Sequence, residues 1–106
     1  MTITQLRYTL AVAEHGNFTT ASDKCFVTQP TLSMQVQKLE EELGVIIFNR
    51  STKPLQVTEI GEKVLSQARK IVEESSRMND VISEEKGIIG GTLKVGIIPT
   101  VSSTLL

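Results

Sequence analysis

One stretch, residues 27–39, constrains the fold more than any other part of this chain. Its apolar residues continue to residue 43 at the spacing of a single helix face: Leu32, Val36, Leu39 and Leu43. Thr28 is the expected N-cap, and Pro30 falls in the first turn, where its missing N–H leaves no hydrogen bond unmade. Gly44 suits the left-handed position just past the end. The stretch therefore predicts a helix of about four turns that begins near residue 29.

The opposite face of this helix is polar but almost uncharged. Its residues are Thr31, Ser33, Met34, Gln35, Gln37 and Lys38. An ordinary surface helix is dense in Glu and Lys, whereas a helix that contacts base edges needs short hydroxyl and amide side chains near its N-terminus. A surface helix that is polar for no functional reason would look the same, so this stretch alone leaves both interpretations open.

Residues 4–15 predict a first helix. One face of it carries Leu6, Leu10 and Ala13. Thr4 is the expected N-cap, and Gly16 and Asn17 are expected to end the helix.

A second, short helix is expected from Phe18 to about Cys25. Thr19 is its expected N-cap, and Ala21 supplies a small side chain that lets the next helix cross close by. Phe26 and Val27 then turn the chain. Two helices joined by a short turn, the second opening with Thr-Gln-Pro, predict a helix-turn-helix.

After this motif the pattern changes to that of a hairpin. Residues 45–48 are β-prone, residues 51–54 form a turn, and residues 55–57 form a returning strand. We expect a small wing with Arg50, Thr52 and Lys53 at its tip. Such a tip can reach phosphates or the adjacent minor groove, although a solvated basic turn explains the same residues.

Thr58 is expected to cap a long helix from Glu59 to about Lys86, ended by Gly87. Six residues follow one another at heptad intervals: Val64, Ala68, Ile71, Ser75, Met78 and Ile82. At 1.5 Å per residue this helix is about 42 Å long, too long to pack fully on so small a domain. The first part of this long helix is expected to pack against the helix at residues 4–15 of the same chain, and the remainder against a second copy of the chain. A dimer would place two DNA-contacting helices about 34 Å apart, one turn of DNA.

The last residues indicate a second domain. Gly90 and Gly91 form a hinge by composition, and residues 92–98 are typical of a strand, which cannot bury its faces alone. The expected organisation is a winged helix-turn-helix DNA-binding domain at 1–58, a linker and dimerisation helix at 59–87, and a hinge with the first strand of a second, missing domain at 88–106. The expected fold class is mainly α.

Charge and composition narrow the function. Residues 1–58 carry five Lys or Arg and five Asp or Glu. This balance disfavours nonspecific coating of nucleic acid, which depends on many phosphate contacts, but it allows a sequence-specific protein. A single cysteine, Cys25, precludes an intramolecular disulfide, and no stretch is typical of a signal peptide or membrane span, so a soluble cytoplasmic protein is expected.

Nothing in the sequence favours catalysis. His15 is the only histidine and lies at a helix end, and Cys25 has no plausible base nearby in sequence. No phosphate-binding loop or metal-ligand spacing occurs. We expect no enzymatic activity, no cofactor and no metal.

Together these residues resemble the winged helix-turn-helix and linker helix of LysR-type transcriptional regulators, over residues 1 to about 88. The strongest matches are Ala21, Val27, Thr28, Gln29, Pro30, Leu32, Ser33, Lys38, Leu39, Glu40, Phe48, Arg50, Leu55, Thr58 and Gly61. The resemblance implies a homodimer, often a tetramer, joined through the linker helix, and a C-terminal effector domain that begins near Thr92. RNA polymerase is a possible further partner.

Within that family, three segments resemble the peroxide-responsive OxyR branch. They are residues 28–33, 38–44 and 93–101. The cysteines that sense peroxide in that branch belong to the missing domain, so Cys25 is expected to be a small buried apolar residue. Regulation by a small metabolite in place of peroxide remains an alternative.

The resemblance and the polar face agree on five DNA-binding residues: Thr28, Gln29, Pro30, Thr31 and Ser33. The predicted set is completed by Met34 and Lys38 on the helix and by Arg50, Thr52 and Lys53 on the wing. Gln29 can bond bidentately to adenine, and the methyl group of Thr31 can touch that of thymine. Many family members have Arg where this chain has Met34, so a phosphate or guanine contact there is not implied. For Lys38, as for Arg7, plain solvation is an equal alternative.

A second function class remains open. A coiled-coil module whose helix-turn-helix binds protein would also explain the heptads, and the neutral charge favours it. Affinity for DNA, and its dependence on salt, discriminates between the two classes.

Overall fold

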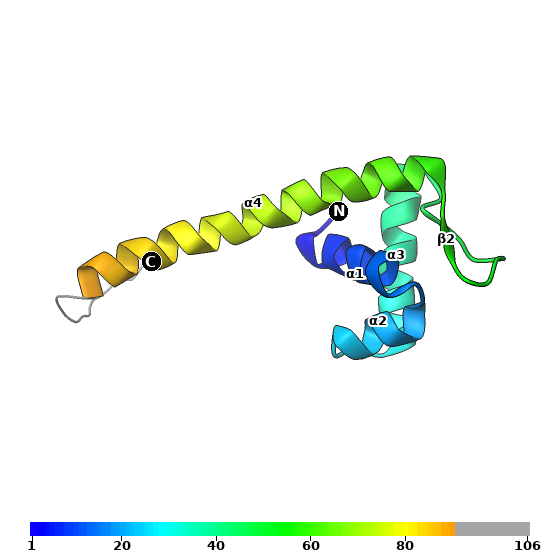
Figure 1. Ribbon diagram of the computed structural model, residues 1–106, viewed down its shortest axis with the longest axis horizontal. Coiled ribbons are helices and arrows are strands. Elements are labelled where there is room, and N and C mark those ends of the chain that lie inside the picture. Colours follow the sequence, from blue (N-terminus) through cyan, green and yellow to red (C-terminus); the bar gives the residue numbers. More distant parts are fainter. Residues whose placement is uncertain (91–106) are drawn as a thin grey trace. The chain divides into compact units, whose positions relative to one another are not determined.

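The computed structural model describes residues 1–90, and the expected strand at 92–98 lies outside them. Four helices and one small hairpin follow in order: α1 (Ile3–His15), α2 (Phe18–Lys24), α3 (Gln29–Leu43), β1 (Phe48–Asn49), β2 (Gln56–Val57) and α4 (Glu59–Gly90) (Figure 1). The mainly α class, with a helix-turn-helix and a wing, is confirmed. The chain divides into two compact units, the first from Met1 to Glu73 and the second from Glu74 onward.

Helix α1 begins at Ile3, earlier than expected, because Thr2 and Gln5 form a capping box. The Gln5 N–H donates to Thr2 Oγ1 at 3.0 Å, and the Thr2 N–H donates to Gln5 Oε1 at 3.2 Å. Thr4 as N-cap was therefore wrong, since only Thr2 has a Gln three residues later to complete the reciprocal pair. Gly16 ends α1 in the left-handed region, at φ 75°.

Helix α2 is capped by Asn17 and not by Thr19, so that prediction was also wrong. Asn17 Oδ1 accepts the Thr20 N–H at 2.7 Å. Asn17 is one of the strongest N-cap residue types and stands directly before Phe18, the first helical residue. Ala21 is fully buried, as expected of the small residue at the crossing of two helices.

Helix α3 has the expected ends. Thr28 Oγ1 accepts the Thr31 N–H at 3.3 Å, Pro30 lies in the first turn, and Gly44 ends the helix at φ 71°. Leu32, Val36 and Leu39 are completely buried, whereas Leu43 at the last turn is partly exposed.

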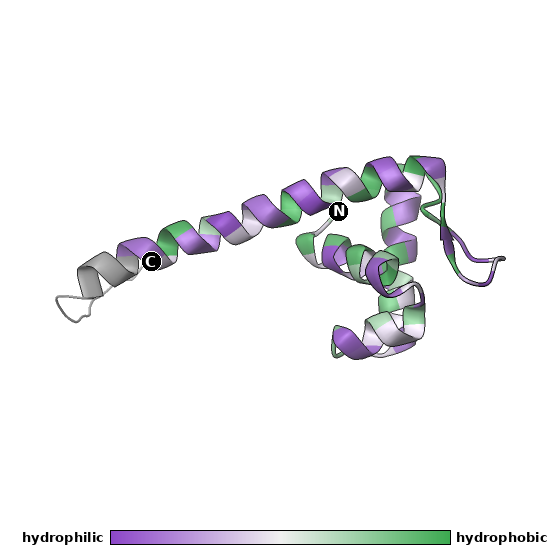
Figure 2. Cartoon of the chain, viewed as in Figure 1, coloured by the Kyte–Doolittle hydropathy of each residue, from purple (hydrophilic) through white to green (hydrophobic). Residues whose placement is uncertain are grey.

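The hydrophobic core of the first unit draws on every helix and on the segment that leads into β1. Its buried members are Leu6, Val12, Ala21, Leu32, Val36, Leu39, Ile47, Phe48, Leu65 and Ala68. Leu65 and Ala68 come from α4, and Val64 and Ile71 pack partly buried beside them. The first part of α4 is thus an integral part of this core. Apolar and polar residues alternate along α4 (Figure 2).

Helix α4 continues past Gly87, its predicted end, to Gly90. A single glycine inside a helix costs about 1 kcal/mol relative to alanine but does not by itself break the hydrogen-bond ladder. Within residues 1–90, none of the helices combines the length and the hydrophobicity that crossing a bilayer requires.

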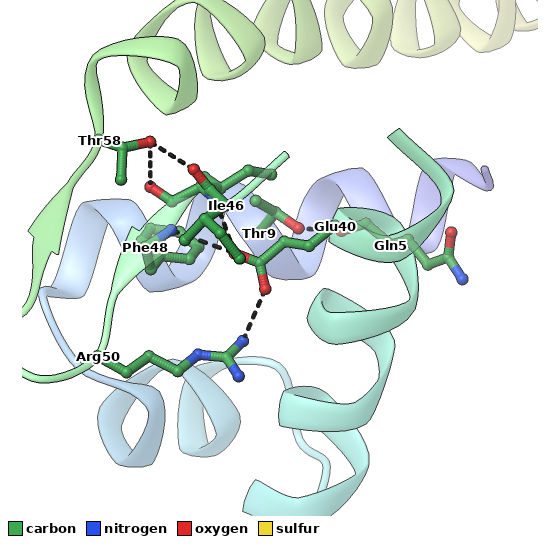
Figure 3. A network of polar contacts seen from close by, with 8 residues as sticks. Gln5, Thr9, Glu40, Ile46, Phe48, Arg50 and Thr58 are labelled. Carbon is green, nitrogen blue, oxygen red and sulfur yellow. Dashed lines mark hydrogen bonds and ion pairs between the residues drawn. The ribbon is translucent and has the colours of Figure 1, made fainter. Parts of the chain in front are cut away.

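The buried carboxylate of Glu40, near the end of α3, binds the segment that leads into the wing (Figure 3). Its Oε2 accepts the N–H of Ile47 at 2.7 Å and that of Phe48 at 3.2 Å. Its Oε1 accepts from Arg50 Nη2 at 3.1 Å. One side chain therefore satisfies two buried backbone donors and holds one cation.

The strands are shorter than predicted, and the residues before β1 direct their N–H groups to Glu40. The N–H of Val45 donates to the Glu40 backbone carbonyl and that of Ile47 to the Glu40 side chain, so neither N–H is available to a neighbouring strand. The ladder begins only at Phe48, which pairs with Val57 in an antiparallel register.

Thr58 joins the wing to the start of α4. Its hydroxyl donates to the carbonyl of Ile46 (Figure 3). Its oxygen accepts the Gly61 N–H at 3.0 Å, as the predicted N-cap should. A Cβ at Gly61 would lie 2.5 Å from the carbonyl oxygen of Ile47, a distance that real Cβ atoms do not adopt. This close approach explains why α4 has glycine in its first turn.

Replacing Glu40 should destabilise the first unit far more than replacing its exposed neighbour. Glu40→Ala leaves the N–H groups of Ile47 and Phe48 without their acceptor, and we expect a loss of about 2–4 kcal/mol in the free energy of unfolding. Glu41→Ala, one residue on, should change it by less than about 0.5 kcal/mol. Urea denaturation of both variants measures the difference, and equal stabilities would contradict this account of Glu40.

Candidate nucleic-acid interface

The N-terminal half of α3 presents most of the predicted DNA-binding residues to solvent. Thr28, Gln29, Pro30 and Thr31 are exposed in its cap and first turn. Met34 and Lys38 are exposed further along, and Ser33 is half-buried. The structure therefore brings these seven residues together on one exposed part of a single helix.

The cap of α3 organises two hydroxyl groups. Thr28 Oγ1 and Thr31 Oγ1 are hydrogen-bonded at 2.7 Å. The first turn of α3 contains no acidic residue. The unpaired N–H groups at a helix N-terminus carry a positive partial charge, which favours a phosphate at this position.

Gln35, which the sequence placed on the polar face, has a structural role. Its Oε1 accepts a hydrogen bond from Gln5 Nε2 at 3.0 Å, and both side chains are largely out of solvent. This bond ties α1 to α3. No periodic signal indicated it, because the two residues are thirty positions apart.

Arg50 is folded back onto the domain and does not extend from the tip of the wing (Figure 3). Its guanidinium pairs with Glu40 and lies 4.9 Å from the centre of the Phe18 ring. Phe18 in turn packs edge-on against Phe48, with ring centres 6.0 Å apart. The Arg50 side chain remains 38% exposed, so one side of it is open to a phosphate.

The turn of the wing is organised by Asn49. Its Oδ1 accepts the Ser51 N–H at 3.2 Å, and its backbone carbonyl accepts from Thr52 Oγ1 at 3.2 Å. Thr52 is consequently half-buried. Lys53 is exposed and, among the described residues, makes no ion pair or hydrogen bond. Lys53 is thus the cation at the tip, as predicted.

The predicted dimerisation residues of α4 fall into two groups. Val64, Ala68 and Ile71 contribute to the core of the first unit, in agreement with the expectation that the first part of the seam packs on its own domain. In the second unit, Met78 is 66% and Ile82 48% exposed, and Ser75 is half-buried. These later positions leave apolar surface in contact with water.

Cys25 and His15 lie at the ends of two helices. Cys25 ends α2 and packs, partly buried, against the core, and this burial raises the pKa of its thiol. His15 is the last residue of α1. Within the part of the chain that the structure describes, no three His, Cys, Asp or Glu side chains are grouped to hold a metal ion.

These features define a winged helix-turn-helix with an exposed, uncharged helix N-terminus beside a cationic wing. Residues 3–62 match the family of bacterial regulatory helix-turn-helix proteins called the LysR family, and the chain belongs to it. Among curated proteins, the chain is 41% identical over all its 106 residues to the DNA-binding transcriptional dual regulator OxyR of Escherichia coli. The chain spans only 35% of the length of that relative.

Solved structures agree with this assignment. A full-length OxyR variant from Pseudomonas aeruginosa is 42% identical, with a TM-score of 0.78, and the match covers 81% of this chain and 29% of that one. The DNA-binding domain of BenM in complex with catB site 1 DNA is 37% identical, with a TM-score of 0.76. That match covers 79% of this chain and 94% of the BenM chain.

The raised pKa of Cys25 should make its thiol slow to react. Because less thiolate is present at a given pH between about 7 and 9, iodoacetamide should alkylate Cys25 several-fold more slowly than it alkylates glutathione. In urea, where burial is lost, the two rates should become similar. Timed alkylation followed by mass spectrometry tests this, and a folded-state rate above that of glutathione would contradict it.

Proposed function

We propose that this chain is the DNA-binding domain and linker helix of a LysR-type transcriptional regulator, acting in the cytoplasm on double-stranded DNA. The observation that carries the proposal is the exposed first half of α3, where hydroxyl and amide side chains occur without a single acidic residue. Side chains of this kind are those that bond to base edges in the major groove. The BenM complex, whose matched part is a domain bound to DNA, supports the same role here.

In this proposal the residues divide into two kinds of contact. Gln29 bonds to a base, and Thr31 touches a thymine methyl group, because both lie exposed in the first turn of α3. Thr28, Ser33, Arg50, Thr52 and Lys53 bind phosphates, which set the orientation on the duplex without reading its sequence. Lys38 on α3 and Arg7 on α1 are exposed, and both are proposed to bind phosphates as well.

We propose further that the chain acts as a homodimer on an inverted repeat. Met78 and Ile82 support this part, because apolar side chains spaced four residues apart on an exposed helix are typical of a helix-helix seam. A tetramer of the full-length protein and a contact with RNA polymerase extend the same proposal.

The signal is proposed to be hydrogen peroxide, on the strength of the OxyR relatives, with a small metabolite as the alternative. The sequence identities of the OxyR and BenM structures differ little, at 42% and 37%. The DNA-binding half therefore discriminates weakly between branches of the family. Linking this chain to its own effector domain and measuring transcription with and without peroxide decides between them.

The rival function is a coiled-coil module that binds protein. Fluorescence anisotropy of the chain on a duplex with two inverted half-sites and on a scrambled duplex, across a salt series, separates the two. A DNA-binding regulator binds the paired half-sites more tightly and loses affinity as salt rises. A complex with a protein partner that is insensitive to salt, and no affinity for either duplex, would favour the rival.

Gln29→Ala and Lys53→Ala should weaken DNA binding in different ways. Loss of a bidentate base contact at Gln29 should cost about 1–3 kcal/mol on the specific duplex and relax base preference at one position. Loss of a phosphate contact at Lys53 should weaken all duplexes alike and reduce the salt slope by about 1. If both variants changed matched and scrambled duplexes identically, this division of roles would be wrong.

Ile82→Asp should weaken the dimer. A carboxylate inside an apolar helix seam loses its hydration, so the dissociation constant of the dimer should rise at least about tenfold. Ser83→Asp adds the same charge one residue away, off the seam, and should leave association unchanged. Sedimentation of both variants makes the comparison, and equal dimer stability would place the interface elsewhere on α4.

A further inference from the structure

Phe26, in the turn between α2 and α3, is conspicuous in two ways. Its side chain is 94% exposed, more than any other large apolar residue in the described part of the chain. Its backbone lies at φ 59°, and within residues 1–90 it is the one non-glycine residue with positive φ. Both features cost free energy in the isolated domain.

The backbone conformation itself has a plain structural reason. The N–H of Phe26 donates to the carbonyl of Asp23 at 3.2 Å, and the N–H of Val27 donates to that of Ser22 at 3.1 Å. These two bonds form a Schellman motif, which ends α2 and turns the chain toward α3. The motif requires a left-handed residue between Cys25 and Val27.

The motif does not require phenylalanine. Glycine adopts the left-handed conformation without a Cβ clash, and asparagine tolerates it. The chain itself uses glycine as the left-handed residue that ends α1 and α3. Gly16 lies at φ 75° after α1, and Gly44 lies at φ 71° after α3. At residue 26 the backbone is strained instead, and the side chain is a solvent-exposed aromatic ring that buries almost no surface in the fold.

We infer that Phe26 is an additional DNA contact, which packs against the C5-methyl group of a thymine at the edge of the half-site. This inference rests on the proposed function. Apolar contact with the thymine methyl is a recognised way for a phenylalanine to read sequence in the major groove. It would also return, on binding, the cost of exposing the ring.

The position of Phe26 brings it within reach of the same duplex as α3. Two peptide units separate it from Thr28, the N-cap of α3, so their Cα atoms are at most about 7.6 Å apart. Thr28, Gln29 and Thr31 are exposed on this end of α3. DNA that receives the N-terminus of α3 therefore passes beside residue 26.

A protein partner for this ring is less consistent with its surroundings. Interfaces between proteins are built on a cluster of apolar anchors. Phe26 is followed by the half-buried Val27 and then by four exposed residues, of which Thr28, Gln29 and Thr31 are polar. An isolated ring among hydroxyl and amide groups matches the mixed polar and methyl edge that a base pair presents in the major groove.

The test compares Phe26→Asn with the unsubstituted full chain. Each is used to enrich binding sequences from a pool of random DNA duplexes, and affinities are then measured on the duplex that the unsubstituted chain enriches. Phe26→Asn should bind that duplex about five- to tenfold more weakly, and its enriched motif should lose a thymine preference at one position. Its Tm should be unchanged or several degrees higher, because asparagine relieves the left-handed strain.

A second arm probes the methyl group directly. Replacing that thymine by deoxyuridine, which lacks the C5-methyl, should weaken the unsubstituted chain by a similar factor and leave Phe26→Asn unaffected, as coupled partners do. The matched control is Ile46→Asn. Ile46 is 62% exposed but lies beyond the opposite end of α3, a helix about 22 Å long, and the control should keep both motif and affinity.

Three results would overturn the inference. If Phe26→Asn enriches the same motif with the same affinity, the ring does not touch DNA. If its Tm falls markedly, the ring stabilises the fold. If deoxyuridine weakens both proteins equally, the methyl group is read by another residue. If the unsubstituted chain itself enriches no motif, the proposed function is refuted, and the inference with it.

Discussion

The carboxylate of Glu40 is the interaction on which the arrangement of α3 and the wing depends. Glu40 lies in the last turns of the helix whose first turn is proposed to meet DNA, and it binds the backbone of Ile47 and Phe48 and the guanidinium of Arg50. Because Arg50 also lies over the Phe18 ring, its guanidinium connects the wing to both α2 and α3. A buried carboxylate with three donors is strongly directional, so these elements hold one geometry and not a range of them.

The two ends of α3 are thereby given separate tasks. Its C-terminal half is occupied by structure: Leu39 is buried, Glu40 holds the wing, and Gly44 turns the chain. Its N-terminal end leaves Gln29 and Thr31 exposed. Side chains that contact bases need a rigid support, and the buried half of the same helix supplies it.

Local sequence patterns predicted what local physics decides, and failed where distant residues compete. Thr28 and Gly44 were correct because each stands next to a clear apolar repeat. Thr4 and Thr19 were wrong as caps because a nearby residue, Thr2 or Asn17, makes the better hydrogen bonds. The β-prone residues before Phe48 do not form a strand, and the N–H groups of Val45 and Ile47 donate to the backbone carbonyl and the carboxylate of Glu40.

The side-chain contacts that the sequence did not predict share one property. Gln5 and Gln35 meet across thirty positions, and Arg50 reaches Glu40 and Phe18, which neither periodicity nor composition encodes. The resemblance to LysR-type regulators predicted the fold correctly. It did not indicate that Arg50 turns inward, or that Phe26 occupies a position where glycine would suffice.

The burial of Leu65 and Ala68 bears on how proteins of this architecture can be recombined. The compact unit that contains the winged helix-turn-helix extends to Glu73, so the first half of α4 belongs to its core. A chimera joined at residue 58 would pair the core of one parent with the helix of another, and each mismatched side chain would leave a cavity or a clash. A junction after residue 73 exchanges the core intact. Recombination of this winged helix-turn-helix with other domains, whether by evolution or by engineering, should therefore favour breakpoints in the second half of α4.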